Sequence, residues 1–136
     1  MKVHTKAEIA ISSLLQAKRM FLAGDYISAT ILAGAGQQIL RDLCKSRAVM
    51  PTIARLSGSS GYSVKSIHNL VTDSYNKMKH AEKDPEEMVE VSEDEARVLM
   101  TLAATDLMLL KEIKSKEISD FVDFVRNIKA AVAGTS

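Results

Sequence analysis

Apolar residues recur every three or four positions along most of this chain, the spacing that places them on one face of a helix. No segment alternates apolar and polar residues as a half-buried strand does. Aromatic residues make up only 4% of the sequence, whereas strands favour them. A length of 136 residues suits one domain with its own core. The sequence therefore predicts an all-α fold in a single domain over residues 1–136.

Capping patterns indicate where the helices begin and end. Thr5 and Glu8 have the spacing of a capping box, in which each residue caps the backbone of the other. Ser92 and Glu95 form a second such pattern, and Asp25 is a good N-cap directly after a glycine. The predicted helices are 5–23, 25–47, 62 or 63 to 82, 92–114 and 117–132. Because the first two and the last two have short connections, we expect an antiparallel up-and-down bundle of four to five helices.

The remaining segments are predicted to be irregular. Residues 48–61 contain a proline and a Gly/Ser cluster, so we expect a loop there with at most a short helical turn. Asp84 and Pro85 end the third helix within an acidic link over residues 83–92. Residues 133–136 are expected to form a polar tail.

The middle of the second helix, Leu32-Ala-Gly-Ala-Gly36, is unusually rich in small residues. A glycine inside a helix costs about 1 kcal/mol relative to alanine. Two of them in one turn therefore indicate that another helix approaches closely at this point. Ile27 and Ile31 lie away from the main apolar stripe of the same helix, and extra apolar surface of this kind favours a homodimer.

The sequence shows no sign of secretion, of a membrane span or of a cofactor. The N-terminus lacks the apolar stretch of a signal peptide, and the longest apolar run, residues 98–110, is too short for a span. We therefore expect a cytoplasmic protein without membrane contact and without a cofactor. The single cysteine, Cys44, excludes an internal disulfide, and its helical setting favours a buried structural thiol.

A polar seam follows the predicted third helix on the side opposite its apolar stripe. Its members are Asn69, Asp73, Asn76 and His80. At the helical advance per residue they fall within an arc of roughly 60°. Asn and His are poorer helix formers than the Lys and Glu of ordinary exposed faces. We therefore interpret the seam as a candidate site, with simple solvent exposure as the alternative.

The seam contains the candidate functional residues. His80 can act as a general acid or base and Asn76 can orient a ligand, so these two are the candidate catalytic residues. The candidate binding residues are Asn69, Asp73, Lys77 and Asp84. Asp73 or Asp84 shares a helical face with His80, but two ordinary ligands are weak evidence for a metal, and we expect none.

Three further polar residues lie on or beside faces that are otherwise apolar. Asp106 projects from the core face of the fourth helix and Lys18 from that of the first, while His68 lies at the edge of the third. An unpaired buried carboxylate is costly and needs a cation or several hydrogen bonds. We therefore expect Asp106 to meet Lys18 or His68 inside the bundle, in a structural or a catalytic role.

The charges are unevenly distributed although the net charge is only +1. Residues 1–80 hold eleven Lys and Arg against four Asp and Glu, whereas residues 81–96 hold eight acids and one lysine. A basic half can attract phosphate, and a concentrated acidic segment can repel phosphate or mimic it. The lysines that accompany the seam are Lys65, Lys77, Lys79 and Lys83. They favour contact with nucleic-acid phosphates, with ordinary surface lysines as the alternative.

Two segments resemble a known family. SATILAGAGQQIL, followed by YNKMKHAEKDP, is similar to a group of small bacterial proteins with the signature Asn-x-x-Lys-His-Ala-x-x-Asp-Pro. Those proteins and this chain resemble the HEPN superfamily of helical bundles over about residues 7–115. The resemblance implies an antiparallel helical bundle that often dimerises. The active members of that superfamily are metal-independent ribonucleases.

The HEPN ribonuclease motif has an arginine, usually a polar residue such as Asn, and then a His after four to six intervening residues. Asn76 and His80 match the Asn and the His. At the arginine positions this chain has Asp73, Ser74 and Tyr75, and none of them stabilises charge on a phosphate as a guanidinium does. The resemblance therefore implies the fold more strongly than the nuclease activity, and we favour a protein that is not an enzyme.

The sequence leaves three functions open. The first is an HEPN-like homodimeric binding module for RNA or a nucleotide, with the seam at a cleft or a dimer interface. The second is a weak metal-independent ribonuclease that uses His80, with Asn76 orienting and a nearby lysine holding phosphate. The third is an antitoxin-like regulator whose acidic segment, residues 82–95, docks on a basic protein partner.

Overall fold

Helices make up most of this computed structural model, which describes residues 2–134, with side chains up to residue 128. The elements are α1 (Lys6–Leu22), α2 (Tyr26–Ser46), α3 (Thr52–Ser60), α4 (Val64–Val71), α5 (Asp73–Lys79), the 3-10 helix η1 (Ala81–Lys83), α6 (Glu93–Leu109) and α7 (Lys116–Gly134). Residues 2–134 contain no strand, so the all-α prediction is confirmed.

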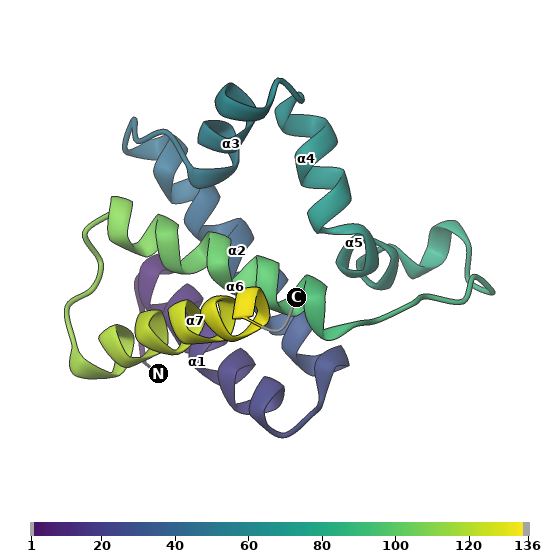
Figure 1. The fold of residues 1–136 in the computed structure, drawn as a ribbon, viewed down its shortest axis with the longest axis horizontal. Helices are drawn as coiled ribbons and strands as arrows, with labels where there is room; N and C mark the ends of the chain where they lie inside the picture. The colour runs from purple at the N-terminus through teal and green to yellow at the C-terminus, as the bar shows by residue number, and fades with distance from the viewer. Residues whose placement is uncertain (1, 135–136) are drawn as a thin grey trace.

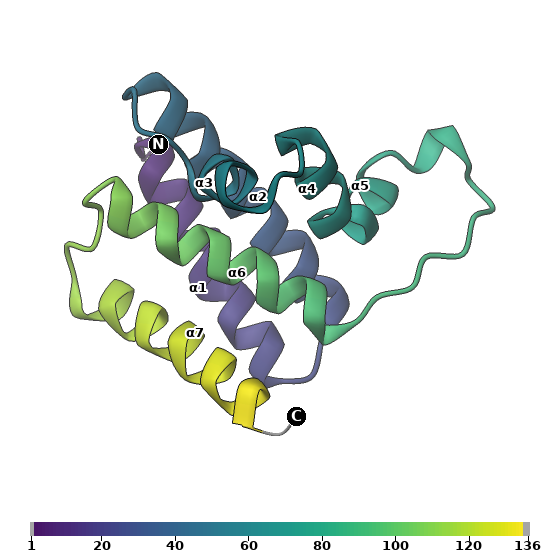
Figure 2. The same ribbon diagram turned by 45° about the horizontal axis from the view of Figure 1, so that its top comes forward.

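Four long helices form the core of the molecule. α2 packs against both α1 and α6, and α7 covers α6 and α1 (Figure 1, Figure 2). In Figure 2, α1 and α7 run one way while α2 and α6 run the other, so the helices joined by short connections are antiparallel. The largest buried side chains of this core include Leu14, Leu40, Leu99, Leu107 and Phe121. Apolar packing of four helices therefore holds this part together.

The chain between α2 and α6 forms an arm, residues 52–83, that arches away from the core (Figure 1). Little of it is buried: only Ile53 in α3, Thr72 between α4 and α5, Ser74 in α5 and no residue of α4. The nine residues of α3 fill most of the segment that the sequence predicted as a loop. The predicted third helix is divided into α4, α5 and η1, so the prediction of one continuous helix to residue 82 is wrong.

The break between α4 and α5 falls at Thr72, which has φ −118° and ψ 18°. The Thr72 hydroxyl donates to the His68 carbonyl oxygen at 2.6 Å, a local bond that competes with regular helical geometry. The Glu95 carboxylate, from α6, then accepts the backbone N–H groups of Ser74 and Tyr75 at 3.0 and 2.9 Å. These are free N–H groups of a helix start, so a residue of the core caps the helix of the arm.

The local capping predictions have different outcomes. Thr5 accepts the N–H of Glu8 at 3.0 Å, and Asp25 accepts that of Ser28 at 3.0 Å, so both predicted N-caps are confirmed. Ser92 precedes α6 as predicted but makes no side-chain capping bond. The capping-box prediction there is wrong, because its Glu partner caps α5 instead.

α6 ends at Leu109, short of the predicted end near residue 114. Lys111 adopts a left-handed φ of 57°, and the Glu112 N–H reaches the Leu107 carbonyl at 3.0 Å, which closes the helix as glycine usually does. At the other end of the chain, α7 continues through Gly134. Residues 133–134 of the predicted tail are therefore helical, and residues 135–136 lie outside the described part.

The small residues of α2 permit two close approaches. A Cβ at Gly34 would lie 2.5 Å from the Tyr75 ring of α5, and one at Gly36 would lie 2.8 Å from Leu14 of α1. The predicted close approach is confirmed. Ile27 and Ile31 of the same helix are 57% and 43% exposed, so they do lie outside the core. None of the helices in the described residues is long and apolar enough to cross a membrane.

Candidate functional site

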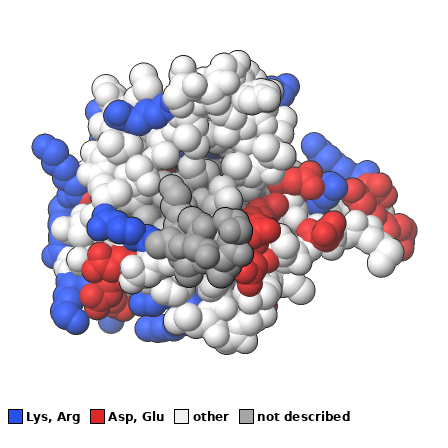
Figure 3. Space-filling view, in the orientation of Figure 1, with Lys and Arg blue, Asp and Glu red and all other residues white. Residues whose placement is uncertain are grey.

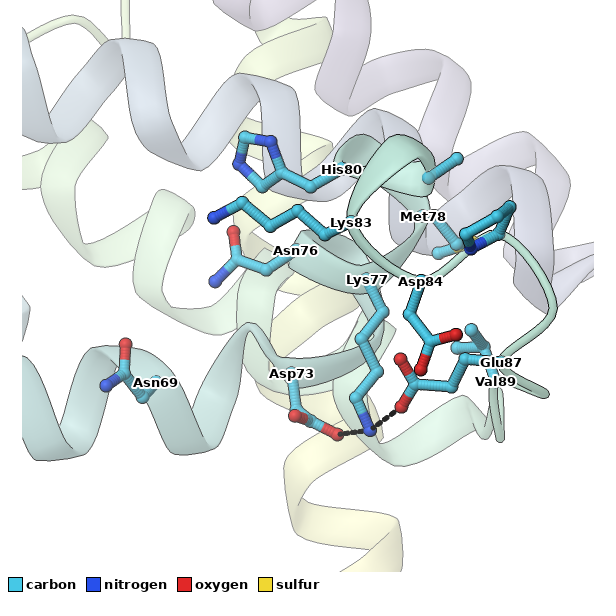
Figure 4. Close-up of a pocket in the computed structure, with 12 residues that line it drawn as sticks. Asn69, Asp73, Asn76, Lys77, Met78, His80, Lys83, Asp84, Glu87 and Val89 are labelled. Carbon is cyan, nitrogen blue, oxygen red and sulfur yellow. Dashed lines mark ion pairs between the residues drawn. The ribbon is translucent and has the colours of Figure 1, made fainter.

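A cleft of about 540 Å³ opens where α4, α5, η1 and the acidic link meet (Figure 4). It is lined by all six residues that the sequence indicated as catalytic or binding: Asn69, Asp73, Asn76, Lys77, His80 and Asp84. Lys83 and Glu87 also line it. The predicted residues therefore gather at one concave site and are not spread along an open helix face.

The sequence predicted the seam on one face of a single helix, but the cleft is not built from one helix face. Asn69 lies on α4, Asp73 and Asn76 lie on α5, and His80 is the C-cap of α5 with φ −114° and ψ 51°. Because α5 ends at Lys79, the tighter 3-10 turn of η1 follows well before the predicted stop at residues 84–85. The break in the arm and this turn, together, bend the seam around the cleft.

The lining side chains form two groups (Figure 4). His80, Lys83 and Asn76 lie beside one another and extend to the same side. Lys77 lies between two carboxylates, with its Nζ 3.4 Å from Asp73 Oδ2 and 3.1 Å from Glu87 Oε1. The hydrogen bonds to these two carboxylates, Glu87 first, raise the pKa of Lys77. This lysine is therefore a charged but already paired group.

Asn76 and His80 are the two polar groups best placed to meet a ligand. Asn76 Nδ2 donates to Thr72 Oγ1 at 2.8 Å, and that hydroxyl donates to the His68 carbonyl, so the amide is held in orientation. His80 Nδ1 lies 3.8 Å from Glu82 Oε1, which leaves its Nε2 for a ligand. Together they offer hydrogen bonding and one acid–base group.

Lys83 is the cation that faces this pair. Lys79 is directed elsewhere, because its Nζ donates to Gln38 Oε1 at 3.1 Å and lies 5.7 Å from the centre of the Tyr75 ring. Among the described side chains, no carboxylate lies within ion-pair distance of Lys83. The sequence indicated Lys83 only as one lysine of four, and it did not indicate Glu87. The spacing of Glu87 from Lys77 follows no helical period, so no sequence pattern pointed to their contact.

The arginine of the HEPN motif has no substitute at the positions where its spacing allows one. Asp73 is paired with Lys77, Ser74 is buried, and the Tyr75 ring packs over Gly34. Each of these side chains therefore has another role in the structure. A phosphate in the cleft would have to rely on Lys83, with His80 and Asn76 as hydrogen-bond donors.

The prediction for Asp106 is half right. Its side chain is buried, with 1% exposed, but it meets neither Lys18 nor His68. Asp106 Oδ1 accepts the backbone N–H and the hydroxyl of Thr52 at 2.8 and 2.6 Å. In place of the expected cation, the start of α3, in the segment predicted as a loop, supplies these donors. Asp106 Oδ2 is buried without a hydrogen-bond partner among the described residues. Lys18 instead lies over the Phe124 ring at 5.2 Å.

Burial shifts the pKa values of several titratable groups that lie outside the cleft. Burial raises the pKa of Asp106, although the bonds from Thr52 oppose this. Burial, and then the charge of Asp106, raises the pKa of Cys44 to about 11, so its thiol stays protonated. Burial and nearby cations lower the pKa of His68. Within the side chains described, no three His, Cys, Asp or Glu residues lie close enough together to hold a metal ion.

The chain matches no family model, no curated protein and no solved structure. The resemblance to the HEPN superfamily therefore remains a prediction that depends on the motif residues. The cleft itself, with its two groups of side chains and the link that borders it, is the basis for a functional proposal.

Proposed function

We propose that the protein is an HEPN-like binding module, acting as a homodimer, that takes a phosphate-bearing ligand such as RNA or a nucleotide in the cleft at α5. The observation that best supports this proposal is that the polar residues indicated by the sequence line one cleft beside Lys83. Its volume of about 540 Å³ is in the range of small-ligand sites. Lys83 provides charge for phosphate, while Asn76 and His80 provide hydrogen bonds.

Fluorescence anisotropy with a labelled single-stranded RNA tests this proposal. We expect salt-sensitive binding that Lys83→Gln weakens about five- to tenfold, with the slope of log K against log salt reduced by about 0.7. Lys116→Gln is the control, because Lys116 lies on α7 and pairs with Asp120. Equal weakening by both variants, or binding that salt does not affect, would contradict the proposal.

The same RNA distinguishes binding from catalysis. Cleavage without added metal that disappears in His80→Ala would identify the weak ribonuclease, with Asn76 orienting and Lys83 holding phosphate. We expect binding without cleavage, because the described residues that line the cleft include no arginine. Sedimentation of the wild type and of an Ile27→Ser/Ile31→Ser variant tests the dimer, and we expect only the wild type to dimerise.

A protein partner is the second candidate function. Residues 81–88 are exposed, and within this acidic stretch Met88 is 94% exposed. An exposed apolar side chain among acids is suited to a partner with a basic surface. A basic protein retained by the wild type and lost on Met88→Ser, without any RNA binding, would favour this function over the first.

A further inference from the structure

The acidic link returns to the cleft and does not simply project into solvent. We call residues 84–90 the strap. Its Glu87 carboxylate pairs with Lys77 at 3.1 Å, and its Glu90 carbonyl accepts the Ser74 hydroxyl at 2.6 Å. Asp84, Pro85 and Val89 also line the cleft. In Figure 3 acidic side chains gather over the side of the molecule where the link lies in Figure 1.

While the strap is in its observed position, the cleft is unfavourable for an anion. The lining holds three carboxylates, those of Asp73, Asp84 and Glu87, against the ammonium groups of Lys77 and Lys83. Two of the three carboxylates belong to the strap. If the strap moves away, Asp73 alone remains against the two lysines, and the lining changes from net negative to net positive. A phosphate therefore meets attraction only when the strap is displaced.

The two attachments of the strap differ in strength. The Ser74 hydroxyl belongs to a buried residue and binds a main-chain carbonyl, so this end is fixed independently of charge. The Lys77–Glu87 pair is exposed to water, with 38% and 37% of the two side chains accessible. Exposed ion pairs contribute little to stability and are easily exchanged. The Glu87 end is therefore the releasable end.

We propose that Glu87 is an internal anion that occupies Lys77 until a phosphate group of the ligand displaces it and opens the strap. This inference rests on the proposed function, because it concerns how the same cleft is regulated. Displacement exchanges one carboxylate for one phosphate on Lys77. It restricts the cleft to ligands that carry enough negative charge to compete with a tethered carboxylate.

Glu87→Gln, compared with Glu86→Gln, tests the strap. Both variants remove one negative charge from adjacent positions, but among the described side chains Glu86 has no ion-pair partner. In the RNA anisotropy assay we expect Glu87→Gln to bind about five- to tenfold more tightly than the wild type, and Glu86→Gln less than about twofold. The salt slope should be the same for Glu87→Gln and the wild type, because the bound RNA places one phosphate on Lys77 in both proteins. Equal effects of the two variants would contradict the proposal that Glu87 occupies Lys77 until a phosphate displaces it.

A measurement without RNA separates failure of the strap from failure of the proposed function. The rate at which acetic anhydride modifies Lys77, followed by mass spectrometry, should rise in Glu87→Gln and stay unchanged in Glu86→Gln, because Glu87 pairs with that ammonium group and Glu86 does not. If RNA binds the wild type and both variants alike, the strap is wrong and the binding function stands. If neither the wild type nor the variants bind RNA, the proposed binding function is wrong. An unchanged acetylation rate would then contradict the proposed role of Glu87 as well.

Discussion

The four-helix core and the arm are held by different forces. The core, formed by α1, α2, α6 and α7, buries a continuous cluster of apolar side chains. The arm, residues 52–83, buries few residues and is fixed to the core by polar bonds and one close contact. These attachments include Asp106 to Thr52, Glu95 to the start of α5, Gly34 to Tyr75 and Lys79 to Gln38.

This difference shows how a small bundle can position a cleft outside its core. Apolar packing is strong but non-directional, whereas a hydrogen-bonded carboxylate fixes one helix end in one place. Most of the cleft residues lie beyond Thr72, so their positions depend on these attachments and on polar contacts near Thr72 more than on apolar packing within the arm. Weakening an attachment should therefore change the arm more than the core.

The largest effect is expected at Gly34, where arm and core come closest. In Gly34→Ala the new Cβ would lie 2.5 Å from the Tyr75 ring, so α5 has to move. We expect a loss of about 1–3 kcal/mol in the free energy of unfolding, measured by urea denaturation.

Gly58→Ala is the matched control for this change. It lies in α3 with nothing within 4 Å of a new Cβ, so it should stabilise the protein by about 0.5–1 kcal/mol. The double variant Gly34→Ala/Tyr75→Ala should recover part of the loss, because the clashing ring is gone. A Gly34→Ala protein as stable as the wild type would mean that α5 does not rest on α2.

A smaller effect is expected at Glu95. In Glu95→Gln one of the two carboxylate oxygens that cap α5 is replaced by an N–H donor, at a cost of about 1 kcal/mol. Amide hydrogen exchange should accelerate in residues 73–79 and stay unchanged in α1 and α2. Asp94→Asn, which alters only a surface pair with Arg97, should leave exchange in the arm unchanged. Uniform acceleration throughout the chain would contradict a separate attachment of the arm.

The smallest effect is expected at Asp106, and it depends on pH. Burial raises the pKa of this carboxyl above its ordinary value of 3.8. The contribution of Asp106 to stability is therefore fully present below 3.8 and is lost as pH rises through the raised value. Asp106→Asn does not titrate, so its stability relative to the wild type should increase as the pH rises above about 4 in urea denaturation. Asp120→Asn, at an exposed site on α7, should show no such trend.

Structure that depends on neighbouring residues was predictable from the sequence. The caps at Thr5 and Asp25 bind residues three positions away, and Gly24, with φ 79°, ends α1 as its sequence position indicated. The end of α6 was not predictable in this way. Lys111 takes the same left-handed conformation at φ 57° without being glycine, so nothing in its identity indicates a helix stop.

Structure that depends on distant partners was not predictable. Glu95 has the spacing to cap its own helix, yet it binds Ser74 and Tyr75 of α5. Asp106 was expected to need a cation, yet two donors of Thr52 meet it. For Glu95 the local capping pattern and the observed contact compete for the same carboxylate. In both cases the packing of the arm on the core decides which partner the carboxylate meets.

The sequence by itself determined the all-α class, the long helices and the polar residues Asn69, Asp73, Asn76 and His80. Periodicity and capping act over a few residues, so they can be read along the chain. The tertiary structure alone decided that the seam bends around a cleft, that Lys83 faces Asn76 and His80, and that Glu87 pairs with Lys77. These contacts depend on how the arm sits on the core. Carboxylates and a glycine of distant helices fix that position.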